Sequence, residues 1–441
     1  MIGVSALGAA VIMLASLAPV PVASADPGVR GGVSPGGASS VVGFWAGERF
    51  LGEGGPSGYP ARAADYWADR DLSMWTPELW AMLQRHRVPI YFHLRYGRDF
   101  GAVPHGRLEG DALPIIRRAN QLGVPVFAWV AVPYEDGYWA TQDNAPAQLT
   151  ATTALTEWVR DNHLDIAGVA YDMEPPVDSI NALVAGRMDA VEQTRFIDPA
   201  AQCRAIEQYD AVYNYAREHF GRVVGAPVPF VLDDLANGDL ALQNALGLWG
   251  LPRGAQTLYF QAYRSTVAEV MGADPGPGLI AHYAQQARQV GAERGQLTLG
   301  IAGDGVYREL NTLVDDVRLA RALGATSIPI YSLETAVAAY GVDGVERLVR
   351  AGENPLDDTG VRAAQNPTPQ LVQYLTITNS LDTAATLATP AVTAATGRFA
   401  QPNRSSRPCD TANEPVADGI AALDLPGAEA VRIPVQSAVD R

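Results

Sequence analysis

Cysteine, histidine and positive charge are scarce in this chain of 441 residues. The two cysteines and six histidines are scattered, and none of them has the spacing of a zinc-ligand set, so we expect no metal site and no cofactor. Only 32 basic residues oppose 48 acidic ones, which gives a net charge of −16. This surplus of negative charge disfavours nucleic acid or an anionic membrane surface as a partner, and it suits a soluble protein that acts on neutral material.

The first 25 residues have the pattern of an export signal. An apolar run over 4–17 is followed by prolines and by Ala23-Ser24-Ala25, a small-x-small cleavage site. Because no Lys or Arg precedes the run, the start could lie further upstream, or the segment could be an uncleaved anchor. We favour removal after Ala25. We therefore expect a protein that is secreted or lies in the periplasm or cell envelope, with no stable membrane association, since no other stretch could span a bilayer.

The two cysteines, Cys203 and Cys409, leave two alternatives open. In an exported protein they could form one disulfide bond that ties the C-terminal segment to a helix. They could equally be two free, buried thiols.

Short apolar segments with strand character alternate with helical segments over 41–351. The predicted strands cover 40–46, 88–94, 124–130, 166–173, 228–232, 257–262, 296–302 and 327–333. The predicted helices begin at Thr76-Pro77, Asp111 and Asp198-Pro199, and others cover roughly 147–162, 239–249, 278–294, 309–323 and 335–350. This alternation predicts an α/β protein, a (β/α)8 TIM barrel. A doubly wound open sheet is the alternative, but no glycine-rich phosphate loop follows the first strand.

Segments at both ends fall outside this alternation. Residues 26–40 are rich in Gly, Ser and Pro and are expected to form a disordered leader after the signal peptide of 1–25. Aromatic residues almost vanish over 352–441, where Ala, Thr, Pro and Asp dominate. We expect this C-terminal segment to be an extended tail that packs on the barrel or forms a small β appendage, without a catalytic site.

The fourth predicted strand ends in two carboxylates, Asp172 and Glu174, before two prolines. Residues two apart in a strand face the same side, and proline cannot continue a ladder, so both acids are expected at the C-terminal end of the strand. In a parallel barrel the active site lies at that end. The alternative is a pair that only caps a helix or forms a salt bridge. We expect Glu174 to project into an open cavity that solvent reaches.

Alternation along the other strands places further polar residues at the same end of the barrel. The expected set is Glu48, His93, Arg95, Asp233 or Asp234, Gln261, Tyr263, Asp304, and Ser332 with Glu334, opposite Tyr331 and Leu333. Small inward residues beneath polar ones predict an open pocket of the kind that binds carbohydrate. Aromatic residues on strands or on the loops after them could stack on sugar rings, with core packing as the alternative for each: Trp45, Trp129, Tyr134, Tyr138, Trp139 and Tyr259.

Residues 166–174, Ile-Ala-Gly-Val-Ala-Tyr-Asp-Met-Glu, resemble the fourth-strand signature of the chitinase-like family-18 glycoside hydrolases. Residues 258–263 are similar to the sixth strand of that family, and the resemblance extends over about 41–351. It implies a general-acid role for Glu174. It further implies that Asp172 orients the N-acetyl group of the substrate, which serves as the internal nucleophile, and that Tyr263 donates a hydrogen bond to the same acetamide.

The sequence departs from the family pattern at two places. Ala167 and Ala170 stand where the family has two earlier aspartates, and the tryptophan that ends the eighth strand has no match. Glycoside hydrolysis generally uses two carboxyl groups, so Glu334 or Asp304 could supply the second one beside Glu174. Alternatively, Asp172 and Glu174 suffice with assistance from the substrate.

The sequence therefore predicts a secreted glycoside hydrolase that cleaves a polysaccharide or cell-wall glycan. The main alternative is a non-catalytic carbohydrate-binding barrel, which the two alanines favour and the intact pair of acids disfavours. A lyase or transglycosylase on the same barrel is a third class. A metal-dependent deacetylase is disfavoured because no paired histidines accompany an aspartate.

Overall fold

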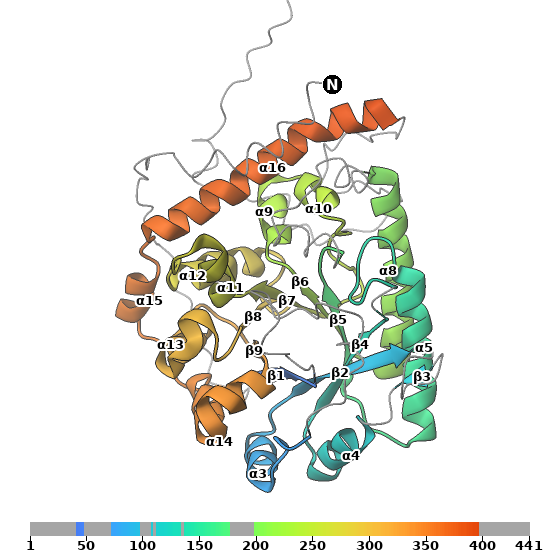
Figure 1. The fold of residues 1–441 in the computed structure, drawn as a ribbon, viewed down its shortest axis with the longest axis vertical. Helices are drawn as coiled ribbons and strands as arrows, with labels where there is room; N and C mark the ends of the chain where they lie inside the picture. The colour runs from blue at the N-terminus through green and yellow to red at the C-terminus, as the bar shows by residue number, and fades with distance from the viewer. Residues whose placement is uncertain are drawn as a thin grey trace, which may run out of the picture.

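A computed structural model describes residues 41–47, 72–97, 107–108, 112–133, 136–176 and 198–396. Its centre is a closed barrel of parallel strands in the order β1-β9-β8-β7-β6-β5-β4-β2, which the pairing of β1 with β2 closes (Figure 1). These strands are β1 Val41–Ala46, β2 Ile90–Gly97, β4 Val126–Ala131, β5 Gly168–Met173, β6 Val223–Pro227, β7 Thr257–Ala262, β8 Gly295–Gly300 and β9 Ser327–Tyr331. A short strand, β3 Arg107–Leu108, pairs antiparallel with the end of β2. Closure confirms the predicted (β/α)8 barrel and is incompatible with an open doubly wound sheet.

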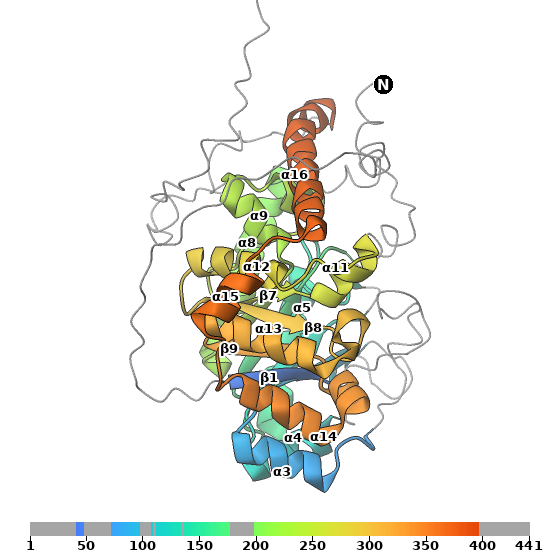
Figure 2. The ribbon, with the colours of Figure 1, turned by 90° about the vertical axis from the view of Figure 1, so that its left-hand side faces the viewer.

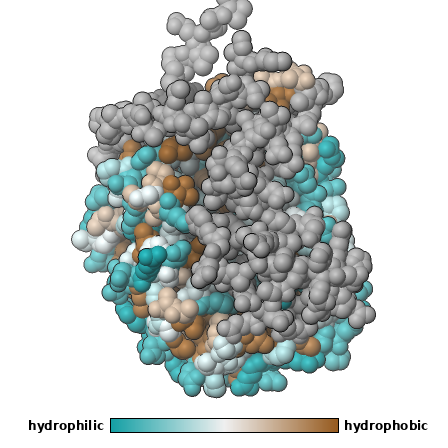
Figure 3. Space-filling model, viewed as in Figure 1, coloured by the Kyte–Doolittle hydropathy of each residue, from teal (hydrophilic) through white to brown (hydrophobic). Residues whose placement is uncertain are grey.

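Helices surround the strands (Figures 1 and 2). They are α3 Pro77–His86, α4 Leu113–Leu122, α5 Ala145–Asp161, α8 Pro199–Phe220, α9 Phe230–Asn237, α10 Ala241–Ala245, α11 Arg264–Met271, α12 Gly278–Gln289, α13 Leu310–Ala322, α14 Leu333–Ala351, α15 Asp358–Ala364 and α16 Pro369–Thr396. Hydrophilic and hydrophobic residues are interspersed on the described part of the face in Figure 3. None of the helices in the described ranges is long and apolar enough to cross a membrane.

Side-chain caps fix the start of two helices where the sequence predicted them. Thr76 Oγ1 accepts a hydrogen bond from the backbone N–H of Leu79 at 3.3 Å, ahead of the proline that begins α3. Asp198 accepts bonds from the N–H groups of Ala200 and Ala201, both at 3.1 Å, at the start of α8. These bonds satisfy donors that the first helical turn leaves without an intrahelical partner.

Alternation along the strands separates two cores. Outward side chains pack on the helices: on β5, Tyr171 Oη lies 2.8 Å from Thr152 Oγ1 of α5, and Met173 Sδ accepts from Tyr213 Oη of α8 at 3.5 Å. Inward side chains fill the barrel with a second cluster, formed by Trp45, Tyr91, Phe127, Trp129, Ala170, Val224, Ala226 and Tyr259. The inward face of β5 predicted from the sequence is therefore confirmed at Ala170.

The predicted fifth strand was placed too late in the chain. The strand is β6 Val223–Pro227, whereas most of the predicted segment, 228–232, turns into α9. Pro229 explains the difference, because it has no N–H for a ladder and sits directly before the first residue of α9. Gly225 marks the true strand: a Cβ there would lie 2.9 Å from side-chain atoms of both Leu258 and Met173, so close packing of β6 needs glycine.

The described part of the C-terminal segment, 352–396, is helical rather than extended or β. Its many alanines are the best helix formers. The long helix α16 lies across α9 and α10 (Figure 1) and packs against both. Ala385 packs in one cluster with Ala241 and Leu242, and Tyr374 Oη lies 2.9 Å from Tyr283 Oη of α12. The segment is thus packed onto the barrel.

Several expectations concern residues outside the described ranges. These are the signal peptide, the leader, Glu48, Asp111, Tyr134 and Cys409. Cys203 on α8 is disulfide-bonded, which is incompatible with two free thiols.

Candidate active site

Asp172 lies at the C-terminal end of β5 and is held from inside the barrel. Gln261 Nε2, on β7, donates to Asp172 Oδ1 at 2.8 Å and to the carbonyl oxygen of Ala226, on β6, at 2.9 Å. One buried amide therefore bridges three neighbouring strands at their C-terminal ends and fixes the direction of the carboxylate. The structure brings together the two residues that the sequence placed here from different strands.

Glu174 follows β5 directly and is more enclosed than expected, with 5% of its surface exposed. The segment after β4 runs beside it: the N–H of Ala140 donates to the carbonyl oxygen of Asp172 at 2.8 Å. Trp139 Nε1 donates to the carbonyl oxygen of Pro175 at 2.6 Å. Trp139 is thus close in space to the pair of acids, as expected, but its side chain is buried and hydrogen-bonded to the backbone. Asp172 itself is half-buried.

Aromatic rings in contact with one another extend from Trp129, in the inner barrel cluster, to residues near the C-terminal ends of the strands. The ring of His93, on β2, lies 4.6 Å from that of Trp129, on β4, and 5.9 Å from that of Tyr138. Trp129 is 6.3 Å from Tyr331, which stacks on Tyr263 at 5.8 Å with an interplanar angle of 18°. The predicted candidates His93, Trp129 and Tyr263 therefore belong to one connected group.

Tyr331 corrects the predicted orientation of the last strand. Alternation predicts Tyr331 outward and Ser332 with Glu334 inward, but Tyr331 contacts Trp129 and Tyr263 inside the barrel. The alternation of Ile328 and Ile330, which pack in the outer core, carries the signal that would have found it. The strand ends at Tyr331, and Ser332 caps α14 through a bond from the N–H of Thr335.

Glu334 has a partner that links helix and strand. It lies in the first turn of α14, and its Oε1 accepts a hydrogen bond from the N–H of Gly47, just after β1, at 2.5 Å. An acidic side chain in this turn is also favoured by the helix dipole. The bond ties the start of α14 to the C-terminal end of β1. That Glu334 serves as a second catalytic carboxylate stays a prediction.

Two further acids have structural partners. Asp304 is exposed and accepts a bond from the N–H of Gly305 at 2.7 Å, which begins the 3₁₀ helix Gly305–Arg308. Asp233 lies on α9, not at a strand end, because β6 ends earlier than predicted. Its carboxylate accepts from Tyr283 Oη of α12 at 3.1 Å, so it faces the helical layer and is not a substrate contact.

The lower barrel interior is closed by hydrogen-bonded aromatic side chains. Trp45 Nε1 donates to Thr298 Oγ1 at 3.0 Å. Tyr259 Oη lies 2.8 Å from Tyr91 Oη and 2.7 Å from Ser327 Oγ. Burial raises the pKa of both tyrosines, so both hydroxyls are neutral. For Trp45 and Tyr259 the core-packing alternative is therefore the better interpretation.

Arg95 and Tyr138 complete the described polar and aromatic residues near the pair of acids. Arg95 is buried near the end of β2 and shares the face of His93. Tyr138 has a backbone φ of 64°, which bulky residues rarely adopt. It is held there by bonds from Val132 N–H to its carbonyl oxygen at 3.0 Å and from its own N–H to the carbonyl oxygen of Pro133 at 3.2 Å. Such strained positions cluster at functional sites.

No protein-family model and no curated protein matches the sequence. Among solved structures, a GH18 chitinase from Pseudoalteromonas aurantia is 13% identical with a TM-score of 0.36, and the match covers 62% of this chain and 96% of that one. A family 1 β-glucosidase from Thermotoga maritima is 13% identical with a TM-score of 0.41, covering 64% and 86%. A GH5-4 endoglucanase from an uncultured bacterium is 13% identical with a TM-score of 0.42, covering 72% and 94%. The barrel assignment itself rests on the strand pairing.

Proposed function

We propose that this protein is a glycoside hydrolase that cleaves a polysaccharide or cell-wall glycan, with Glu174 as the general acid. The observation that carries the proposal is the position of Asp172 and Glu174 at the C-terminal end of a strand in a closed parallel barrel. Active sites of such barrels are built at this end. Two carboxyl groups two residues apart supply the acids that glycosidic cleavage requires.

The roles of the neighbouring residues follow from their contacts and from the resemblance to family-18 hydrolases. Asp172, oriented by Gln261, would position an acyl group of the sugar so that the substrate supplies its own nucleophile. Tyr263, next to Tyr331, would donate a hydrogen bond to the same group. Glu334 and Asp304 are the alternatives for a second protein carboxylate.

Enclosure of Glu174 is compatible with a proton donor. General acids of glycosidases are found in enclosed, apolar surroundings. In the nearby aromatic group only Tyr263 and Tyr331 are half-buried, and their rings are the ones that could contact a sugar. The other members are buried and support them from below: His93, Trp129, Tyr138 and Trp139. Export, in line with the N-terminal pattern, would bring the enzyme to extracellular or envelope glycans.

Replacement of Glu174 tests the assignment. Wild type, Glu174→Gln and the exposed control Glu157→Gln on α5 are incubated with a panel of polysaccharides, and released reducing ends are measured. Loss of a general acid typically lowers the rate by about 10²–10⁴-fold, so Glu174→Gln should lose that much while Glu157→Gln keeps wild-type activity. Full activity in Glu174→Gln would remove this residue from the mechanism.

The 5% exposure of Glu174, with alanine at positions 167 and 170, favours a second candidate, a non-catalytic carbohydrate-binding barrel. This candidate predicts binding on a glycan array without release of reducing ends over long incubation. Release of products by wild type, together with their loss in Glu174→Gln, would exclude it.

A further inference from the structure

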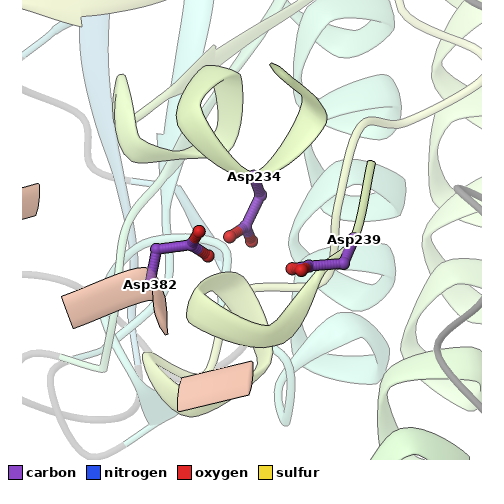
Figure 4. Close-up of side chains that lie close together, drawn as sticks. All are labelled: Asp234, Asp239 and Asp382. Atoms are coloured by element: carbon purple, nitrogen blue, oxygen red, sulfur yellow. The ribbon is translucent and has the colours of Figure 1, made fainter. Parts of the chain in front are cut away.

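Three aspartates converge beneath the C-terminal helix, away from the pair of acids at the end of β5. Asp234 lies on α9, Asp239 follows that helix, and Asp382 lies on α16. Figure 4 shows the three carboxylates pointing toward one another. One oxygen of each lies within 4.8 Å of the other two.

The surrounding backbone holds two of these carboxylates in place. Asp234 accepts bonds from the N–H groups of Leu242, at 3.3 Å, and Gln243, at 2.8 Å. Asp239 accepts from the N–H of Ala241 at 3.0 Å and from Thr386 Oγ1, on α16, at 3.2 Å. Both acids are therefore oriented before any ligand binds.

Asp382 has an acceptor atom that the protein does not satisfy. Its Oδ2 accepts a bond from Asn237 Nδ2, but its Oδ1 is buried and has no hydrogen-bond partner among the described residues. The residue as a whole is 5% exposed. A buried carboxylate oxygen without a partner is costly, so either a cation or a proton shared with Asp234 is expected beside it.

The cluster also lacks a positive counter-charge. None of the ion pairs in the described ranges involves any of the three aspartates. Three carboxylates this close together repel one another when ionised, and a bound cation would relieve that repulsion.

We propose that Asp234, Asp239 and Asp382 bind a calcium ion. The donor set consists of carboxylate oxygens alone, which hard cations prefer and which zinc and copper do not. Ca²⁺ binds oxygen at about 2.3–2.6 Å in flexible geometry, so oxygens within 4.8 Å of one another need only small side-chain shifts to reach one ion. Mg²⁺ demands near-ideal octahedral geometry and is seldom held by an all-protein cage. The half-buried Asp239 leaves a side from which the ion and its waters can enter.

The ion would fasten α16 to the barrel. It would join Asp382 to α9 and to the loop before α10, the elements that already pack against Ala385. The sequence predicted no metal site because it has no cluster of Cys and His, and because Asp382 lies far along the chain from the other two acids. This inference is independent of the proposed hydrolase activity.

Calcium titration of the full chain tests the site. Protein stripped with EDTA is titrated with CaCl2 or MgCl2 in a calorimeter at pH 7.5, and its Tm is recorded in both salts. Wild type should bind one Ca²⁺, with a Tm that rises by a few degrees and with a much smaller response to Mg²⁺. Asp382→Asn and Asp239→Asn should lose this response, whereas the exposed control Asp358→Asn on α15 should keep it.

Two results would overturn the proposal. The first is absence of calcium binding by folded wild type up to about 10 mM CaCl2, which is tenfold above the weakest Kd of extracellular calcium modules. A proton shared between the carboxyl groups would then be the stabilising group. The second is an unchanged calcium response in both cluster variants. If Asp382→Asn does not fold, the half-buried Asp239→Asn decides the matter.

Discussion

Gln261 is the residue whose contacts define the candidate site most sharply. Its amide reaches Asp172 Oδ1 and the carbonyl oxygen of Ala226 at once, so neither end of the bridge can move without losing a bond. A carboxylate that must orient a substrate works only in a narrow range of positions. Under the proposed function, Gln261 would be a positioning residue rather than a group that reacts.

Replacement of Gln261 should lower activity without unfolding the protein. Gln261→Ala leaves Asp172 without this donor, and misplacement of a reacting group by about 1 Å can cost about 10²-fold in rate. We expect kcat/KM to fall by about that factor, with a changed pH profile, which a purely structural role would not produce. Gln286→Ala on α12 is the control. An unchanged kcat/KM in Gln261→Ala would show that this bond does not serve catalysis.

Sequence alone could place Asp172 and Glu174 at the C-terminal end of a strand, because local alternation and two prolines fix where they lie. It could not foresee the 5% exposure of Glu174, which alternation along one strand does not determine. Tyr331 was predicted to face outward. Ile328 and Ile330 face outward instead, so alternation along the strand turns Tyr331 inward. A residue's role thus follows from local pattern only where its neighbours in space are also its neighbours in sequence.

Among the elements, the first and last helices of the barrel are joined by one carboxylate. Glu346 of α14 accepts from Arg85 and lies 3.0 Å from His86 Nε2, both on α3, and it accepts from Arg350 at 2.7 Å. The bond from Arg350, then those from His86 and Arg85, lower the pKa of Glu346 to about 2. The lowered value means that the ionised form is stabilised by folding.

Glu346→Gln should therefore reduce stability in a pH-dependent manner. A carboxyl with a lowered pKa contributes stability that is present above its ordinary value, 4.5, and is lost as the pH falls through about 2. The wild type should exceed the variant by about 1 kcal/mol or less at pH 6, because the network is near the surface. The difference should vanish between about pH 4.5 and pH 2. Urea unfolding at several pH values measures it, with Glu353→Gln as the control, and a pH-independent difference would contradict the account.

Element boundaries were predictable where caps mark them and were missed where tertiary packing decides. Thr76 and Asp198 begin helices at the expected residues. The apolar run 228–232 has the composition of a strand, but Pro229 turns it into a helix start. The alanines of 369–396 favour a helix, yet its position across α9 and α10 depends on contacts far apart in sequence.

For the whole molecule, eight alternations of strand and helix sufficed to predict the closed barrel. Closure brings the C-terminal ends of all the strands together, and this is why residues as distant in sequence as His93 and Tyr331 belong to one aromatic group. The same geometry would let the proposed proton donor, directly after β5, act on a substrate held by several other strands. Chemistry at this end of the barrel is the central claim.

Hydrolysis of glycosides with different leaving groups tests this claim most directly. A general acid matters most when the departing group is a poor one, because a good leaving group departs without a proton. For dinitrophenyl and unactivated glycosides of the same sugar, Glu174→Gln should lose about 10²–10⁴-fold in kcat/KM on the unactivated substrate and far less on the activated one. An equal loss on both substrates, no loss on either, or no hydrolysis by wild type would contradict Glu174 as the proton donor.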